Sequence, residues 1–392
     1  MAWRTSSRHN PGVIGRAHRV AIATVAVTGL SVFAGISAPP SAGTTPPPKA
    51  PDGTTCSPAT LASRLYSPMY VDNSLQVFSG ENLHTIGTVG GLGTPAEMVT
   101  SGDGRTLYID DWGTGSLRVM DACTFRTIAL IPVGSFSIAT YISGPAGSLA
   151  SRYLYVSSLA DEDVNVVDTW TNTIVKQYFV PGIAGAQLSP DGTRLYAVTA
   201  EGVFTFDPMT GRQVAPFLFT GRLVPTWLTA TPDGSKLYLA DTGSDRVSVV
   251  DTHTMKIVKT IQFPFGTAPI TAKVTPDGKE VWIANGASSY GAVVISTATD
   301  SVMKVIPTNG MDLYISFSRD SKYAYLAEGG PASLSAHLGA VFLVVAALSL
   351  VRGDGDIRIV STSTLGQVGP VVQTGQIPGD VSSAQPGLVS GG

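Results

Sequence analysis

Short runs of alternating apolar and polar residues recur along the chain and predict β-strands throughout. One unit shows the pattern: Leu237–Leu239, Val247–Asp251 and Ile257–Ile261 are three such runs, separated by polar turn residues. The turn Pro232–Gly234 precedes them. Because proline presets φ and glycine accepts positive φ, its Pro-Asp-Gly sequence suits a tight turn. With the run that ends before this turn, each unit holds four short strands.

The turns recur about every 43 residues. Four of them carry the aspartates Asp191, Asp233, Asp277 and Asp320, at steps of 42, 44 and 43 residues. Asp103 lies two steps before the first of these, and Gly144–Gly147 fills the gap. Four antiparallel strands in a repeat of this length match the size of a β-propeller blade. The sequence therefore predicts an all-β fold.

The two ends of the repeat region complement one another. The first unit, from Tyr66, has only three strands, and Pro378–Gly387 has the pattern of an isolated strand with its turn. A C-terminal strand that completes the N-terminal blade closes the ring and removes exposed sheet edges. Residues 66–387 therefore predict a seven-bladed propeller of four-stranded antiparallel blades, with an apolar insertion at about 330–352 and a tail at 388–392.

The insertion contains Leu338–Val351, a run of 14 uncharged and mostly apolar residues. This length is too short to span a bilayer as an untilted helix. Two alternatives stay open. The segment packs against its own blade, or it protrudes as an apolar loop that docks on the envelope or on a partner, since exposed apolar patches usually mark interaction sites.

Leu237–Ile261 (LYLADTGSDRVSVVDTHTMKIVKTI) resembles a unit of the YVTN-type β-propeller repeat family, and Ser189–Thr210 and Thr275–Ile306 match it more loosely. The resemblance covers most of residues 66–387 and implies a secreted, WD40-like, seven-bladed propeller. Proteins with similar blades include seven-bladed lactonases and surface-layer-associated proteins. The resemblance therefore indicates an architecture more than a chemistry.

Residues 1–42 have the pattern of a secretory signal peptide. Arg16 and Arg19 precede the uncharged run Val20–Ala38, which ends in small residues. Cleavage is expected near Ala42, with an uncleaved membrane anchor as the alternative, because the run approaches the roughly 20 residues that span a bilayer. Residues 43–65 begin with a proline-rich stretch and are expected to form an extended tether. The protein is therefore expected to be secreted or extracytoplasmic.

The net charge of the chain narrows the range of expected partners. Without the signal peptide the formal charge moves from −3 to −7, with 21 basic against 28 acidic residues. Nucleic acid is not an expected partner, because its phosphates need clustered basic residues. The protein is expected to be a monomer.

In an oxidising compartment Cys56 and Cys123 are expected to form a disulfide, with two free thiols as the alternative.

No sequence motif names a reaction. The chain has no Gly-x-Ser-x-Gly, His-Glu-x-x-His or glycine-rich phosphate-binding motif, so no catalytic residue is predicted. His84, His253 and His337 fall in separate turns or in the insertion, and we interpret them as solvated. The aspartates of the repeated turns are interpreted as turn caps, because Asx side chains close such turns themselves.

The mouth of the axial channel is the predicted ligand site. Alignment of the repeats places at the start of the innermost strands Glu97, Ser137, Gln187, Trp227, Lys273, Tyr314 and Asp380, with Asp312 at the preceding junction. Carboxylates converging from Glu97, Asp312 and Asp380 would hold Ca²⁺ through their oxygens. Trp227 and Tyr314 would instead stack on a sugar or a peptide.

Two functions fit these observations. The favoured one is a non-catalytic binding scaffold of the cell envelope, which recognises a wall polymer or a protein partner and uses no cofactor. The alternative is a lactonase-like hydrolase in which a divalent metal in the axial channel polarises the ester carbonyl.

Overall fold

The computed structural model describes residues 56–57, 60–61, 63–80, 82–134, 136–142, 152–221, 225–286, 290–318, 320–329 and 354–383. The expected signal peptide, most of the tether, the apolar insertion with His337, and the tail lie outside these residues, so those predictions stay untested. None of the helical segments in the described residues has the length and hydropathy of a membrane span.

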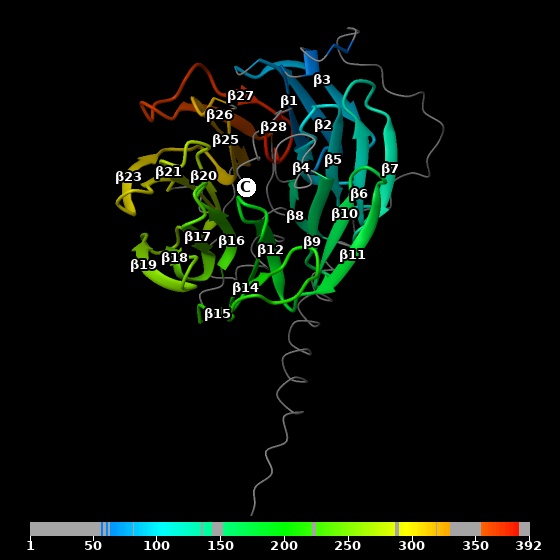
Figure 1. Ribbon diagram of the computed structural model, residues 1–392. Coiled ribbons are helices and arrows are strands. Elements are labelled where there is room, and N and C mark those ends of the chain that lie inside the picture. Colours follow the sequence, from blue (N-terminus) through cyan, green and yellow to red (C-terminus); the bar gives the residue numbers. More distant parts are fainter. Residues whose placement is uncertain are drawn as a thin grey trace, which may run out of the picture. The chain divides into compact units, whose positions relative to one another are not determined.

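Over the described residues the strands form seven four-stranded antiparallel sheets with almost no helix, which confirms the predicted seven-bladed β-propeller. The sheets, one per blade, stand side by side around a ring (Figure 1). Named from the inside outward, blades 1 to 4 are β28 (Ser382–Ser383), β1 (Arg64–Met69), β2 (Ser74–Ser79), β3 (His84–Gly90); β4 (Pro95–Thr100), β5 (Thr106–Asp111), β6 (Ser116–Asp121), β7 (Thr127–Pro132); β8 (Ser137–Ile142), β9 (Tyr153–Ser158), β10 (Asp163–Asp168), β11 (Thr173–Phe179); and β12 (Ile183–Leu188), β13 (Leu195–Thr199), β14 (Gly202–Phe206), β15 (Leu218–Phe219).

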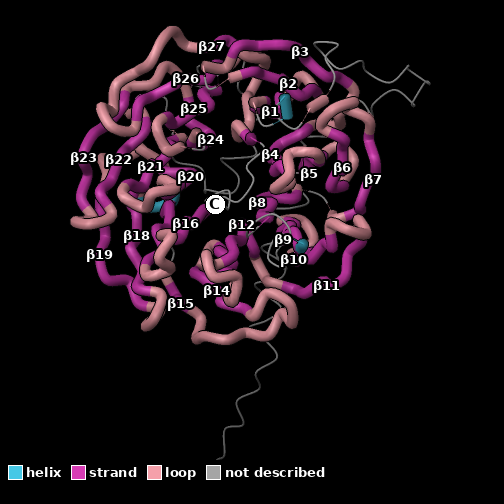
Figure 2. Tube along the Cα trace, turned by 45° about the horizontal axis from the view of Figure 1, so that its top comes forward, coloured by secondary structure: helices cyan, strands magenta, loops and turns pink. Residues whose placement is uncertain are grey.

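Blades 5 to 7 continue the same order around the ring. They are β16 (Pro225–Ala230), β17 (Lys236–Asp241), β18 (Arg246–Asp251), β19 (Lys256–Gln262); β20 (Pro269–Val274), β21 (Glu280–Asn285), β22 (Ala292–Ser296), β23 (Ser301–Ile306); and β24 (Met311–Phe317), β25 (Tyr323–Gly329), β26 (Asp356–Ser361), β27 (Val372–Gln373). The short 3₁₀ helix η1 (Thr242–Ser244) connects β17 and β18. From β4 to β24, each innermost strand contacts the innermost strand of the next blade, and Figure 2 shows these strands around the middle of the ring.

The ring closes where the two ends of the repeat region meet. Strand β28 pairs antiparallel with β1, with Ser382 opposite Tyr66. Gly379 N donates to Pro68 O at 2.7 Å, which extends the pairing toward the start of the innermost position. The C-terminal strand therefore completes the N-terminal blade, as predicted.

The repeated turns are closed by their aspartates. In blade 5, Asp233 accepts hydrogen bonds from Thr231 Oγ1 at 2.6 Å and from Ser235 N at 3.0 Å. These hydrogen bonds hold the pKa of Asp233 below its usual value. Gly234, with φ of 70°, supplies the left-handed residue that the turn requires. The interpretation of these aspartates as turn caps is confirmed.

The core lies between neighbouring blades. The second strand of every blade carries one buried aromatic residue: Tyr66, Tyr108, Tyr155, Tyr196, Tyr238, Trp282 and Tyr325. Each belongs to its own hydrophobic cluster, and each cluster joins two adjacent blades. Burial of such a side chain contributes about 1.5–3 kcal/mol. These seven clusters of the described residues thus hold the blades together around the ring.

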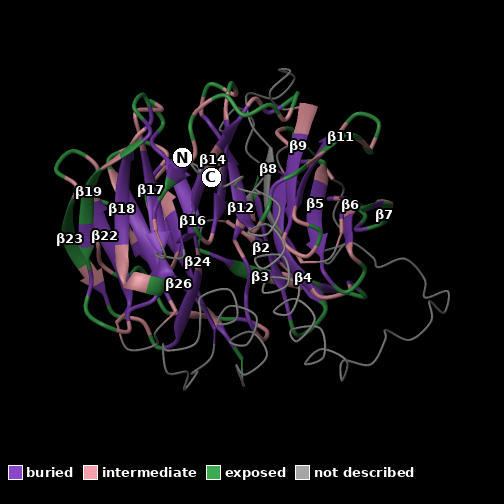
Figure 3. Ribbon diagram, turned by 90° about the horizontal axis from the view of Figure 1, so that it is seen from below, coloured by how far each residue is buried: buried purple, intermediate pink, exposed green. Residues whose placement is uncertain are grey.

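Exposure rises toward the rim. In Figure 3 the inner strands are buried, whereas the outer strands β19 and β23 carry exposed residues. Cys56 and Cys123 form a disulfide with Cα atoms 5.6 Å apart. It ties the segment before β1 to the turn after β6, so it joins blades 1 and 2 covalently.

Candidate binding site at the axis of the ring

An eighth hydrophobic cluster differs from the seven between the blades, because it collects residues from five blades. Its members come from the segments at the start of the innermost strands and at the end of the second strands: Tyr70, Ala96, Trp112, Met311, Leu313 and Ile377, with Phe136, Ile270 and Tyr314 packed against them. Residues of blades 1, 2, 3, 6 and 7 can meet only near the axis of the ring. This cluster therefore marks one end of the axis.

Three aromatic rings form a row within this cluster. The Trp112 ring lies 5.3 Å from the Tyr70 ring and 5.3 Å from the Phe136 ring, both edge-to-face. Trp112 Nε1 donates to the Ser137 carbonyl at 2.6 Å, which fixes the indole. Sequence analysis missed Trp112 because it follows β5, outside the innermost strand. The matching positions of blades 1, 3 and 6 are Tyr70, Leu159 and Gly286, whose N–H groups make equivalent backbone bonds. Because these residues differ in type, the repeat gave no signal for an aromatic residue at this position.

Charged side chains from two non-adjacent blades meet near the axis of the ring. Lys273 Nζ of blade 6 lies 3.6 Å from Asp380 Oδ2 of blade 1, and the two side chains are 13% and 20% exposed. Blade 7 stands between these blades, so the ion pair reaches across the inner edge of blade 7. The distance exceeds the roughly 2.7–2.9 Å of a strong charged hydrogen bond. The pair is therefore loose.

Tyr314 of blade 7 is close enough to Asp380 for this carboxylate to affect its pKa. Burial raises the pKa of the Tyr314 phenol well above its usual value, and the nearby carboxylates Glu97, Asp380 and Asp110 raise it further. The phenol therefore stays protonated and can donate a hydrogen bond at any physiological pH. We call Glu97, Lys273, Tyr314 and Asp380 the axial cluster. Sequence analysis aligned all four at the channel mouth. Lys273 and Asp380 form an ion pair, and Glu97 and Asp380 both affect the pKa of Tyr314.

The axial cluster contains an unsatisfied acceptor. Asp380 Oδ1 is buried and accepts no hydrogen bond within the described residues, while Oδ2 faces Lys273. A buried carboxylate oxygen without a donor is costly by about 1–3 kcal/mol. A ligand that donates a hydrogen bond there would remove this cost.

The seven aligned residues occupy three register positions, not one. Trp227 and Tyr314 lie opposite Ala240 and Ala327 of the second strand. Lys273 lies two residues further along, opposite Trp282. Gln187, opposite Tyr196, shares the position of Lys273, and Ser137, opposite Ser158, comes two residues earlier than Tyr314. Register shifts near the start of the innermost strands, such as the one between Asp312 and Tyr314, set these positions.

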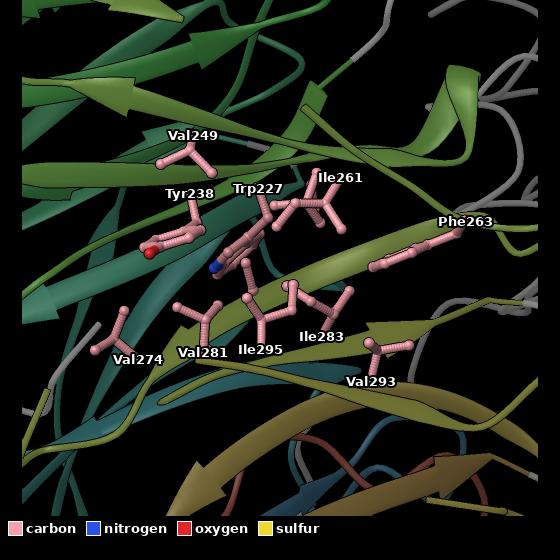
Figure 4. Packing of buried hydrophobic residues seen from close by; sticks show 13 residues of the cluster. Trp227, Tyr238, Val249, Ile261, Phe263, Val274, Val281, Ile283, Val293 and Ile295 are labelled. Carbon is pink, nitrogen blue, oxygen red and sulfur yellow. The ribbon is translucent and has the colours of Figure 1, made fainter. Parts of the chain in front are cut away.

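Two predicted residues lie away from the axial cluster. Trp227 is 8% exposed and packs in the cluster between blades 5 and 6 with Tyr238, Val281 and Ile283 (Figure 4). Its indole is therefore part of the core and is not available to stack on a ligand. Gln187 is also buried, at 5% exposure, on β12.

Asp312 belongs to a row of acids in blade 7. It lies opposite Glu328, which in turn lies opposite Asp356 on the next strand. Arg358 neutralises Glu328, with Nε donating to Oε1 at 2.6 Å. Burial and the neighbouring Glu328 raise the pKa of Asp312 well above its usual value and that of Asp356 to about 6. The carboxylates beside Asp312 in this row are therefore Glu328 and Asp356.

The described residues contain no group of three or more His, Cys, Asp or Glu side chains arranged to hold a metal ion. The axial cluster instead combines carboxylates with an ammonium and a phenol. This donor set suits a polar organic ligand, which can both donate and accept hydrogen bonds.

No protein-family model matches the chain, and no curated protein matches its sequence. Solved β-propellers resemble its structure. A functionally unknown protein from Desulfotomaculum acetoxidans has a TM-score of 0.64 and 11% identity, over 83% of this chain and 99% of its own. A putative 6-phosphogluconolactonase from Bacteroides uniformis has a TM-score of 0.62 and 15% identity, over 81% and 98%. The Swd1 β-propeller domain of Myceliophteria thermophila has a TM-score of 0.59 and 13% identity, over 76% and 91%. Identities this low show the fold alone, and propellers host unrelated functions.

Proposed function

We propose that this protein is a non-catalytic binding propeller of the YVTN-like kind. In this proposal it acts outside the cytoplasm, in the cell envelope, and takes its ligand at the axial cluster. The ligand is a polar group carried by a wall polymer or by a partner protein.

The ion pair between Lys273 and Asp380 carries the proposal. The seven inter-blade clusters supply the packing that holds the ring, so the fold does not require opposite charges at its axis. Taking charges out of water costs several kcal/mol per ion unless their partners compensate. The loose pair and the unsatisfied Asp380 Oδ1 are only partly compensated in the protein alone. Such groups are typical of a site completed by a ligand.

The proposed location rests on two features. The basic and apolar pattern of residues 1–42 is that of an export signal. The Cys56–Cys123 disulfide is of the kind that persists in oxidising compartments. N-terminal sequencing of protein recovered from the producing cells tests the first feature, with a new terminus near Ala42 as the expected result.

Arrays of wall glycans and peptides, probed with the exported protein, test the binding function. The expected result is at least one ligand class whose signal changes strongly in Asp380→Asn and Lys273→Met. Asp103→Asn is the matched control: it removes one charge from the same blade as Glu97, beyond the opposite end of β4. A panel of lactones with added Ca²⁺ or Mg²⁺ tests the hydrolase alternative. Metal-dependent lactone hydrolysis that Asp380→Asn abolishes would replace the binding function with the hydrolase alternative.

A further inference from the structure

The geometry points to a primary ammonium group as the part of the ligand that the axial cluster recognises. This inference rests on the proposed binding function and names the ligand chemistry. An amino sugar and a lysine side chain both carry this group, and the two sources are separated by experiment below.

The charges around the axis favour a cation. Glu97, Asp110 and Asp380 are close enough to Tyr314 for their carboxylates to raise its pKa. Lys273 supplies one positive charge beside Asp380. The phenol of Tyr314 stays neutral. A ligand ammonium is attracted by carboxylates near it, whereas a ligand carboxylate or phosphate would be repelled by them.

The hydrogen-bonding capacity also favours a donor. Asp380 Oδ1 is buried with no donor among the described residues. An ammonium offers three N–H donors and no acceptor. A charge-assisted hydrogen bond to Oδ1 is about twice as strong as a neutral one. The ammonium therefore supplies the group that this carboxylate lacks.

The Lys273 ammonium occupies the place beside Asp380 that a ligand ammonium would take. Its Nζ lies 3.6 Å from Asp380 Oδ2, which is an ion pair without a short hydrogen bond. A second ammonium at Asp380 would be repelled by Lys273. Removal of the Lys273 charge is therefore expected to strengthen binding of a cation, an effect opposite in sign to damage of the site.

Two partly exposed aromatic rings, Tyr314 and Phe136, pack against the cluster that contains Tyr70 and Trp112. Tyr70 and Trp112 are as buried as Trp227, so the methylene stem or sugar ring that carries an ammonium is expected to lie against the Tyr314 or the Phe136 ring. Aromatic faces attract cations within about 6 Å. Carboxylates beside aromatic rings form a common environment for an amine.

Two pairs of probes differ only in the charge of the amine. Tri-lysine is compared with its ε-acetylated form, and a glucosamine trisaccharide with its N-acetylated form, by isothermal titration calorimetry with the exported protein. We expect the charged member of at least one pair to bind ten-fold or more tightly than its acetylated partner. The pair that shows the difference identifies the source of the amine.

The variants carry opposite expectations. Asp380→Asn and Glu97→Gln should weaken binding of the charged probe ten-fold or more, Lys273→Met should tighten it several-fold, and Asp103→Asn should leave it unchanged. Thermal melting of each variant checks that it folds. If Asp380→Asn fails to fold, Glu97→Gln still tests the expected weakening of binding and Lys273→Met the expected tightening.

Two results overturn the inference. In the first, neither charged probe binds better than its acetylated partner, while the arrays yield a neutral or acidic ligand that depends on Asp380; the proposed function then stands without the ammonium. In the second, Lys273→Met lowers the affinity for the charged probe as much as Asp380→Asn does. If no array ligand depends on Asp380 or Lys273, the binding function itself fails.

Discussion

Glu328 and Arg358 face each other on adjacent strands of blade 7, with Nε to Oε1 at 2.6 Å and a second bond from the guanidinium to Oε2 at 3.2 Å. Their side chains are 1% and 9% exposed. Asp312 and Asp356 lie on either side of Glu328, so Arg358 is the cation that holds three acids together.

Replacement of Arg358 by Met should therefore destabilise the protein strongly. The change leaves Glu328 buried between two other acids. Removing one partner of a buried ion pair costs about 3–5 kcal/mol of stability. Urea unfolding measures the loss. Lys322→Met is the control, because its partner Asp320 and Lys322 itself are exposed and such pairs contribute about 0–1 kcal/mol. Equal small losses in both variants would contradict this account of the row.

The raised pKa of Asp241 predicts that the protein loses stability as the pH rises. Burial raises its pKa to about 6, although Ser248 donates to it at 2.5 Å. In the unfolded chain an aspartate has a pKa of about 3.9. The folded state therefore binds more protons between these values, and its stability falls as the pH rises through them. The loss is on the order of 2–3 kcal/mol. Asp241→Asn should remove this part of the pH dependence.

The measurement is the free energy of unfolding in urea, for the parent and for Asp241→Asn, at several pH values between about 4 and 7. The difference between the two proteins isolates Asp241 from the other titrating groups. A difference that does not change with pH would show that the Asp241 carboxyl titrates normally.

The Cys56–Cys123 disulfide should stabilise the protein through its unfolded state. It closes a loop with a sequence separation of 67, for which the chain-entropy model gives about 4 kcal/mol as an upper value. A Cys56→Ser, Cys123→Ser double variant should unfold at lower urea, and a reductant should shift the parent toward the variant. Coincident curves would mean that the bond adds no stability.

The closing strand β28 should keep the propeller from associating. A chain that ends at Gly375 lacks the partner of β1, and an open inner edge is a template for pairing with another chain. Light scattering should show concentration-dependent association. A chain that ends at Ser383 keeps β28 and serves as the control. A shortened chain that stays monomeric would show that β28 is dispensable for closure.

The repeat architecture followed from the sequence because its signals are local. The Pro-Asp-Gly turns at Asp233 and Asp277 set the period, and a strand-like segment before Gly387 indicated how the ring closes. Glu97, Tyr314 and Asp380 could be placed together because they belong to the blades that flank the closure. These inferences needed only strand order and spacing.

The environment of each inner residue did not follow from the sequence. Trp227 and Tyr314 share one register position, opposite Ala240 and Ala327, yet Trp227 is enclosed by apolar side chains of blade 6 and Tyr314 lies near carboxylates. The next blade decides between these surroundings, and spacing within one repeat carries no information about it. The acid row of blade 7 was missed for a related reason: Asp356 follows the insertion, where the period is lost.

The central claim is that a ligand docks against Lys273 and Asp380. A double-mutant cycle tests it most directly: the affinity of the ligand found on the arrays is measured for the parent, Lys273→Met, Asp380→Asn and the double variant. The account predicts that both single changes alter the affinity and that their effects are not additive, because residues in contact couple. Four equal affinities, in proteins with the same melting temperature, would contradict it.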